Sequence, residues 1–242
     1  ILLELQEDKD VRIDEAAYIK ARLFDMLVGD WDRHADQWRW ALHTQDDGAK
    51  LYKPIPRDRD NAFPKYDGVF PAILKLAAPI SRNMQSYTKE NPSTKWLNHA
   101  GYYLDKSFIN SADWNTWKTQ AEYIQNNLTD EVIDNAFAGL LEDTQDESIA
   151  VIRETMKKRR DKLVAMAQDY YDYFKKHEIV VATAKDNTVE ITREDNGITS
   201  IIIKEDETVI LSNQYDRDLT SEIWIYTLDG DDTITITGDG DD

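Results

Sequence analysis

The stretch LVGDWDRHADQ at residues 27–37 decides the fold, because one periodic pattern ends there and another begins. Before it, residues 14–28 repeat apolar side chains at helical spacing, with Asp14 as the expected N-cap and Gly29 as the expected end of the helix. After it, residues 38–42 alternate between apolar and polar side chains. A polar Gln-Asp-Asp-Gly turn follows at 45–48, and apolar side chains return at 51–55. The sequence therefore predicts a helix, a polar loop and a β-hairpin, in that order.

The remaining helical part is less regular at first. Residues 64–110 carry four prolines and little periodicity, so we expect loops and short helices there. Ser111 and Thr129 are expected to cap the next two helices. Residues 144–147 have the form of a capping box and open the longest helical pattern, which runs from Ile149 to about residue 176.

After residue 178 the helical period gives way to six short β-rich runs, at 179–183, 188–192, 198–204, 208–211, 222–226 and 233–237. A strong hairpin turn at 195–197 joins two of them. The expected fold class is α+β. Residues 1–177 form a mainly helical domain with a β-hairpin. Residues 178–242 form a small, acidic all-β domain, antiparallel or like a β-roll and truncated at its C-terminus.

The charge balance limits the possible partners. The chain has 242 residues with 47 acidic and 29 basic side chains, a net charge of −18. Binding to phosphate backbones or to anionic lipid depends on Lys and Arg, so we expect neither nucleic acid nor an anionic membrane surface as a partner.

The absence of Cys excludes disulfides and thiolate zinc sites. No apolar run is long enough to predict membrane insertion by this segment. The chain starts without Met and ends in mid-pattern, so we expect a fragment of a longer polypeptide.

The polar loop carries Asp32 directly after the first helix, and a second cluster with Asp58 and Asp60 follows the hairpin. Two loops that bracket one hairpin lie at the same end of it, so Asp32 is expected near Asp58 and Asp60. Phosphoryl transfer uses such a set, with one carboxylate for the attacking hydroxyl and oxygen ligands for magnesium.

These two clusters resemble motifs of atypical kinases. Asp32-Arg33-His34 is similar to the Asp-Arg-His catalytic loop of phosphatidylinositol kinases and secretory-pathway protein kinases. The run from residue 55 to 63, Ile-Pro-x-Asp-x-Asp-x-x-Phe, is similar to the second motif of spore-coat kinases of the CotH type. The resemblance covers roughly residues 14 to 65.

The resemblance implies a kinase C-lobe acting with ATP and Mg²⁺. Asp32 would be the catalytic base, Arg33 and His34 would belong to the catalytic loop, and Gln37 would be a cofactor-binding second metal contact. Asp58 or Asp60 would hold the metal. The sequence departs from the pattern at Gln37, where Asn or Glu is usual, and it lacks the Gly that often follows the metal-binding Asp. Neither a Gly-rich loop nor a Lys on a strand precedes the first helix. The nucleotide-binding lobe is therefore expected upstream, and the fragment alone is expected to be inactive.

Residues 21–63 and the β-rich tail also resemble the middle region of large Bacteroidetes surface proteins. Those proteins pair a metallophosphoesterase-like part with an outer-membrane barrel. The resemblance implies a bacterial cell envelope location, on the periplasmic or cell-surface side, with other domains of the same polypeptide as partners. It leaves the phosphoryl acceptor and the oligomeric state open.

The acidic tail contains Gly-x-Asp-x-Ile, similar to part of the calcium-binding nonapeptide of repeats-in-toxin β-rolls. Residues 205–242 hold 12 acidic side chains and one basic. Asp229, Asp231 and Asp232 are the candidate Ca²⁺ ligands, since clustered carboxylates suit this cation. The alternative is a solvated turn between strands, because the period is ten rather than nine and the copies are few.

A second interpretation of the whole chain stays open. Arg33, Arg57 and Arg59 among the neighbouring aspartates could form a buried ion-pair network that joins the hairpin to the helix end. His34 could be a hydrogen-bonded structural group. The chain would then be a non-catalytic structural or connector module of a cell-surface protein, with calcium bound by its tail.

Overall fold

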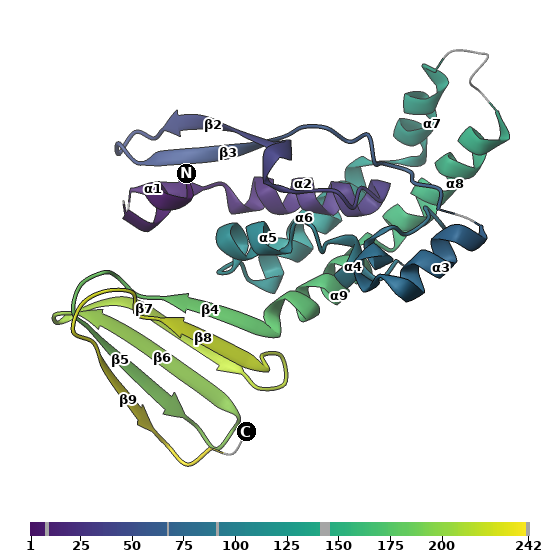
Figure 1. Cartoon of the computed structure of the whole chain (residues 1–242). Coiled ribbons are helices and arrows are strands. Elements are labelled where there is room, and N and C mark those ends of the chain that lie inside the picture. The colour runs from purple at the N-terminus through teal and green to yellow at the C-terminus, as the bar shows by residue number, and fades with distance from the viewer. Residues whose placement is uncertain (8–9, 67, 91, 141–145, 241–242) are drawn as a thin grey trace. The chain divides into compact units, whose positions relative to one another are not determined.

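The computed structural model describes residues 1–7, 10–66, 68–90, 92–140 and 146–240, and it has the α+β fold that the sequence predicts (Figure 1). The chain divides into two compact units, Ile1–Tyr171 and Asp172–Asp242. This division lies six residues before the boundary between residues 177 and 178 that the change of periodicity predicts. None of the described helices is long and apolar enough to cross a membrane.

The first unit begins with α1 (Leu2–Glu7), β1 (Val11–Ile13) and α2 (Glu15–Val28). The side chain of Asp14 accepts a hydrogen bond from the backbone N–H of Ala17 at 2.9 Å, and Gly29 ends α2 in the left-handed conformation at φ 77°. The predicted helix and both of its caps are therefore confirmed.

The short 3₁₀ helix η1 (Ala35–Gln37) leads into the predicted hairpin, β2 (Trp38–Thr44) and β3 (Lys50–Pro56). Strand β1 pairs in parallel with β3, which gives a three-stranded sheet in the order β1-β3-β2. Helix α2 packs along β3 (Figure 1). At the base of the hairpin, the rings of Tyr18 and Trp38 lie 4.6 Å apart, and Trp40 meets Phe108 at 4.8 Å. The first contact holds the hairpin against α2, and the second joins it to the helix Tyr102–Ile109, which carries Phe108.

The rest of the unit is helical, as expected. Short elements cover the proline-containing region: α3 (Val69–Ala77), η2 (Pro79–Asn83), α4 (Thr94–Leu97) and α5 (Tyr102–Ile109). The longer helices are α6 (Trp114–Asn127), α7 (Asp130–Ala138), α8 (Glu147–Asp161) and α9 (Leu163–Lys175), the last of which runs into the second unit. Thr129 caps α7 as predicted.

Two helix predictions were wrong. Asp113, not Ser111, caps α6, and the Ser111 hydroxyl instead donates to Glu15 at 2.7 Å. The long helical pattern from residue 149 to 176 is broken at Lys162 into α8 and α9. The Gln125 side chain donates to the carbonyls of Arg160 and Asp161, and it thereby satisfies acceptors that a continuous helix would use. Of the predicted capping box, residues 144–145 lie outside the described residues, and Asp146 caps α8.

The second unit contains the six strands that the sequence predicts: β4 (His177–Val181), β5 (Asn187–Arg193), β6 (Ile198–Glu205), β7 (Thr208–Asp216), β8 (Glu222–Tyr226) and β9 (Thr233–Thr237). They form a two-stranded sheet, β4-β8, and a four-stranded sheet, β7-β6-β5-β9. The hairpins β5-β6 and β6-β7 are antiparallel, but β4-β8 and β5-β9 are parallel. The four-stranded sheet is therefore mixed and the two-stranded sheet is parallel, so the unit is not wholly antiparallel. Its buried core residues are Val180, Ala182, Val189, Ile201, Ile203 and Tyr215.

Candidate functional site

A buried carboxylate organises the loop between α2 and β2. Asp25, on α2, has no exposed side-chain surface, and Nε of Arg33 and Nε of Arg59 each lie 2.9 Å from one of its oxygens. A third arginine, Arg22, lies 3.5 Å away. Burial raises the pKa of Asp25, against the opposing effect of these three guanidinium groups.

Arg22 extends the network to the next helices. Its guanidinium makes a double contact with Asp105 on α5, at 2.8 and 3.1 Å, and it donates to Asn98 at 2.9 Å. The hydroxyls of Tyr18 and Tyr170 also donate to Asp105, at 2.8 and 2.7 Å. A fully buried carboxylate therefore receives four hydrogen bonds, which is the saturation that a buried charge requires.

Arg33 joins the two sequence clusters. Its Nη1 donates to the side chain of Gln37 at 2.9 Å and to the backbone carbonyls of Arg57 and Asp58 at 2.5 and 2.7 Å. The N–H of Arg57 also donates to the Gln37 carbonyl at 2.8 Å. The segment that follows β3 is thus fixed against the loop that precedes β2, as expected for two loops at one end of a hairpin.

The candidate carboxylates take no part in this network. Within the described residues, the side chains of Asp32, Asp58 and Asp60 make no ion pair, and Asp58 and Asp60 are exposed. The network uses Asp25 and Asp30 instead. The interpretation of these arginines as a buried network thus fits Arg33 and Arg59 but not Asp32, Asp58 or Asp60.

Two residues in the segment that carries the candidate metal ligands, Asp58 itself and Phe63, have unusual backbone conformations. Asp58 has φ 54° and Phe63 has φ 56°. Asp tolerates this left-handed region, but a bulky aromatic residue rarely adopts it. The Phe63 N–H donates to the Val28 carbonyl at 2.9 Å, so tertiary contacts impose the conformation. Strained residues of this kind gather at functional sites.

A polar pocket of about 450 Å³ opens beside this junction. Two arginines, a histidine, an amide and two carboxylates line it: His34, Asp36, Gln37, Arg39, Arg57 and Asp58. The structure thus brings together three of the predicted site residues, His34, Gln37 and Asp58. Asp32 and Asp60 do not line this pocket. Arg33 is buried and does not line it either.

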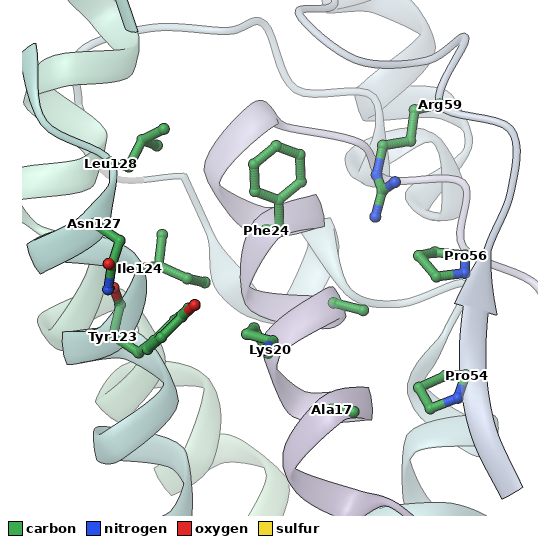
Figure 2. Close-up of a pocket in the computed structure, with 11 residues that line it drawn as sticks. Ala17, Lys20, Phe24, Pro54, Pro56, Arg59, Tyr123, Ile124, Asn127 and Leu128 are labelled. Carbon is green, nitrogen blue, oxygen red and sulfur yellow. The ribbon is translucent and has the colours of Figure 1, made fainter. Parts of the chain in front are cut away.

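A second pocket, of about 440 Å³, is mostly apolar and lies between α2, β3 and α6 (Figure 2). Figure 2 shows Phe24 at its centre, with Pro54 and Pro56 on one side and Tyr123 on the other. It contains none of the predicted catalytic or metal-binding residues. Arg59 lines this pocket and also pairs with Asp25.

The acidic turn of the second unit uses its carboxylates for backbone hydrogen bonds. Asp232 accepts from the N–H of Asn187 at 2.9 Å, and Asp229 accepts from the N–H of Gly230 at 3.1 Å. The N–H of Asp231 donates to Asp186 at 2.9 Å. The described residues contain no group of three or more His, Cys, Asp or Glu side chains arranged as metal ligands. Calcium binding by Asp229, Asp231 and Asp232 stays a prediction.

Sequence reasoning missed Arg22, Asp25 and Asp105. Arg22 and Asp25 are buried on α2 together with the apolar residues Leu23 and Met26, and their position within the apolar pattern of this helix is the signal that could have revealed a buried pair. Asp105 has no comparable signal, because its partners come from distant segments.

Comparison of the chain with known protein families, with curated proteins and with solved structures found no match.

We expect Arg33→Met to lower the free energy of unfolding by about 3–5 kcal/mol, because it leaves buried Asp25 without one of its closest cations. Arg57→Met is the matched control, since its side chain is exposed, and we expect a change within about 0.5 kcal/mol. Urea unfolding of both variants measures the difference. Equal small losses would contradict the assigned role of Arg33.

Asp30 gives the unfolding free energy a pH dependence. Burial and the nearby Asp25 carboxylate raise the pKa of Asp30 to about 6, whereas an unfolded Asp titrates near 3.9. The folded state therefore binds the proton more tightly, and its stability falls as pH rises from about 4 to about 6. Asn at this position does not ionise. As the pH rises from 4 to 7, we expect the free energy of unfolding of Asp30→Asn to increase by up to about 3 kcal/mol relative to that of wild type. A difference that stays constant across this range in urea unfolding would refute the shift.

Proposed function

We propose that residues 1–177 are the C-terminal lobe of an atypical kinase-like phosphotransferase in a bacterial envelope protein. Asp32 is the catalytic base, and Asp58 or Asp60 is the magnesium ligand. The observation that carries the proposal is the position of Arg33, which anchors the loop with Asp32 to the segment with Asp58 while leaving these carboxylates outside every described ion pair.

Phosphoryl transfer depends mainly on positioning and on neutralising charge, because its transition state is loose. A rigid connection between the loop that carries Asp32 and the segment that carries Asp58 and Asp60 supplies such positioning. Arg33 makes this connection through backbone carbonyls, so it does not consume the carboxylates that the reaction needs.

The residues in the proposed site have separate roles. Asp32 accepts the hydrogen bond of the attacking hydroxyl and orients it toward the phosphoryl group. Arg39 and Arg57 line the polar pocket and offer positive charge to phosphate oxygens. His34, also in the pocket and exposed, is available as a further donor.

The donor set suits magnesium bound together with a nucleotide. Such a magnesium takes one or two protein carboxylates and completes its shell with phosphate oxygens and water. Asp58 and Asp60 are exposed, and neither is neutralised by a described cation. Gln37 is a weaker candidate for the second contact, since its side-chain oxygen already accepts from Arg33. Bound magnesium would neutralise charge on the transferred phosphoryl group.

The proposal needs a nucleotide-binding lobe from another part of the same polypeptide or from a partner. It also takes the bacterial envelope as the setting, from the resemblance to surface proteins. If catalysis is absent, the alternative is a non-catalytic connector module in the same setting.

Calorimetric titration and turnover assays with Mg²⁺ and ATP test the proposal in the longest natural polypeptide that contains these residues. We expect Asp32→Asn to retain nucleotide binding and to lose turnover by about 10²-fold or more. Asp58→Asn or Asp60→Asn should weaken Mg²⁺-dependent binding.

Asp46→Asn is the matched control, because it makes the same charge change in the exposed turn at the other end of the hairpin. It should leave binding and turnover unchanged. Absence of Mg²⁺-dependent ATP binding, or equal effects of Asp32→Asn and Asp46→Asn, would reject the proposed function in favour of the connector.

A further inference from the structure

The apolar pocket between α2, β3 and α6 is hollow because of the side chains that α2 places there (Figure 2). Ala17, Lys20, Ala21 and Phe24 are spaced three and four residues apart, so they share one face of the helix. Two of the four are alanines, whose methyl groups fill little of the space between α2 and its neighbours. The resulting volume of about 440 Å³ is within the range of small-molecule sites.

Much of the pocket wall has a fixed shape. Pro54 and Pro56 supply the wall on β3, opposite the two alanines of α2, and Ile124 and Leu128 contribute to the wall on the α6 side. Alanine and proline lose no side-chain rotamer freedom when a ligand covers them. A ligand that enters therefore buries apolar surface at little cost in conformational entropy of the protein.

The charged side chains in this pocket are both cations. Lys20 and Arg59 line it together with nine uncharged residues, although the whole chain has 47 acidic and only 29 basic side chains. Each cation lies beside an aromatic ring of the pocket. The Lys20 ammonium is 4.8 Å from the centre of the Tyr123 ring, and the guanidinium carbon of Arg59 is 5.2 Å from that of Phe24. The charge complementarity of this pocket therefore favours an anion.

The two cations differ in how much charge they can offer a ligand. Nε of Arg59 lies 2.9 Å from Asp25, so part of its charge is neutralised within the protein. Within the described residues, the Lys20 ammonium contacts the Tyr123 ring but makes no ion pair. A ligand with one negative charge matches Lys20. A phosphate with two charges would bring more negative charge into this mostly apolar site than Lys20 balances.

We propose that this pocket binds a small carboxylic acid with an aromatic ring on a short alkyl chain. The ring packs on Phe24 and against Pro54 and Pro56, and the carboxylate pairs with Lys20. This site is independent of the phosphotransferase proposal, because none of its lining residues is a proposed catalytic residue or magnesium ligand.

Titration of the ¹⁵N-labelled full chain with phenylbutyrate, followed by NMR, tests the proposal. We expect saturable shifts centred on the amides of residues 17–24, 54–59 and 123–128. The expected dissociation constant is about 0.1–1 mM, as for a ligand of about twelve non-hydrogen atoms. Phenylbutanol has the same body without the charge, and it should bind about tenfold more weakly because it cannot pair with the ammonium.

Three variants separate the charge from the cavity. Lys20→Met keeps the apolar stem, so it should weaken phenylbutyrate binding about tenfold and leave phenylbutanol binding unchanged. Lys53→Met is the matched control, because Lys53 is exposed and precedes Pro54 on β3, where successive side chains point to opposite faces. It should bind both compounds like wild type. Ala21→Leu fills the cavity and should abolish binding of both.

Unchanged melting temperatures establish that the variants fold. If Ala21→Leu unfolds, the two lysine variants with the two compounds provide the test. Absence of saturable shifts, or shifts centred on the polar pocket at residues 34–39, would overturn the proposal. Equal affinity for phenylbutyrate and phenylbutanol in wild type, or equal losses in Lys20→Met and Lys53→Met, would overturn it as well.

Discussion

Asp25 is the charge on which the first unit depends. It is fully buried, and Arg33 and Arg59 each place a nitrogen 2.9 Å from its oxygens. Removing a carboxylate from water is costly unless it is paired and hydrogen-bonded. Arg22, on α2 itself, lies 3.5 Å away. Arg33 comes from the loop before β2, and Arg59 comes from the segment after β3. The need to satisfy one buried charge therefore fixes three segments relative to one another.

This arrangement separates structural charges from available ones. The arginines between residues 22 and 59 that are buried or half-buried pair with Asp25, Asp30 and Asp105. Asp32, Asp58 and Asp60 lie close in sequence to these pairs but outside them. Strain at Asp58 and Phe63 persists because the surrounding contacts determine the backbone. The network leaves Asp32, Asp58 and Asp60 outside its described ion pairs, and Asp58 lines the polar pocket.

Local signals predicted much of the fold. The helix before the loop, with Asp14 and Gly29 at its ends, and the hairpin after it follow from periodicity and caps. The break at Lys162 could not be predicted, because it depends on Gln125 from another helix. The parallel pairing of β5 with β9 joins residues 45 apart, and no local pattern encodes it.

The candidate site shows the same division. The order of the two acidic clusters around the hairpin predicted that they share one end, and Arg33 joins them there. Asp25 was not predicted as the partner of Arg33, because a charged residue within the apolar pattern of α2 signals burial but does not identify the partner.

Paramagnetic broadening by Mn²⁺ in the presence of ATP, followed by NMR on the ¹⁵N-labelled chain, tests most directly whether the free carboxylates form a cation site. Mn²⁺ shares the oxygen ligands that magnesium prefers. We predict that amides at residues 30–37 and 57–61 broaden first. Broadening centred on the acidic turn at residues 229–232, or spread evenly over the acidic surface, would contradict the account.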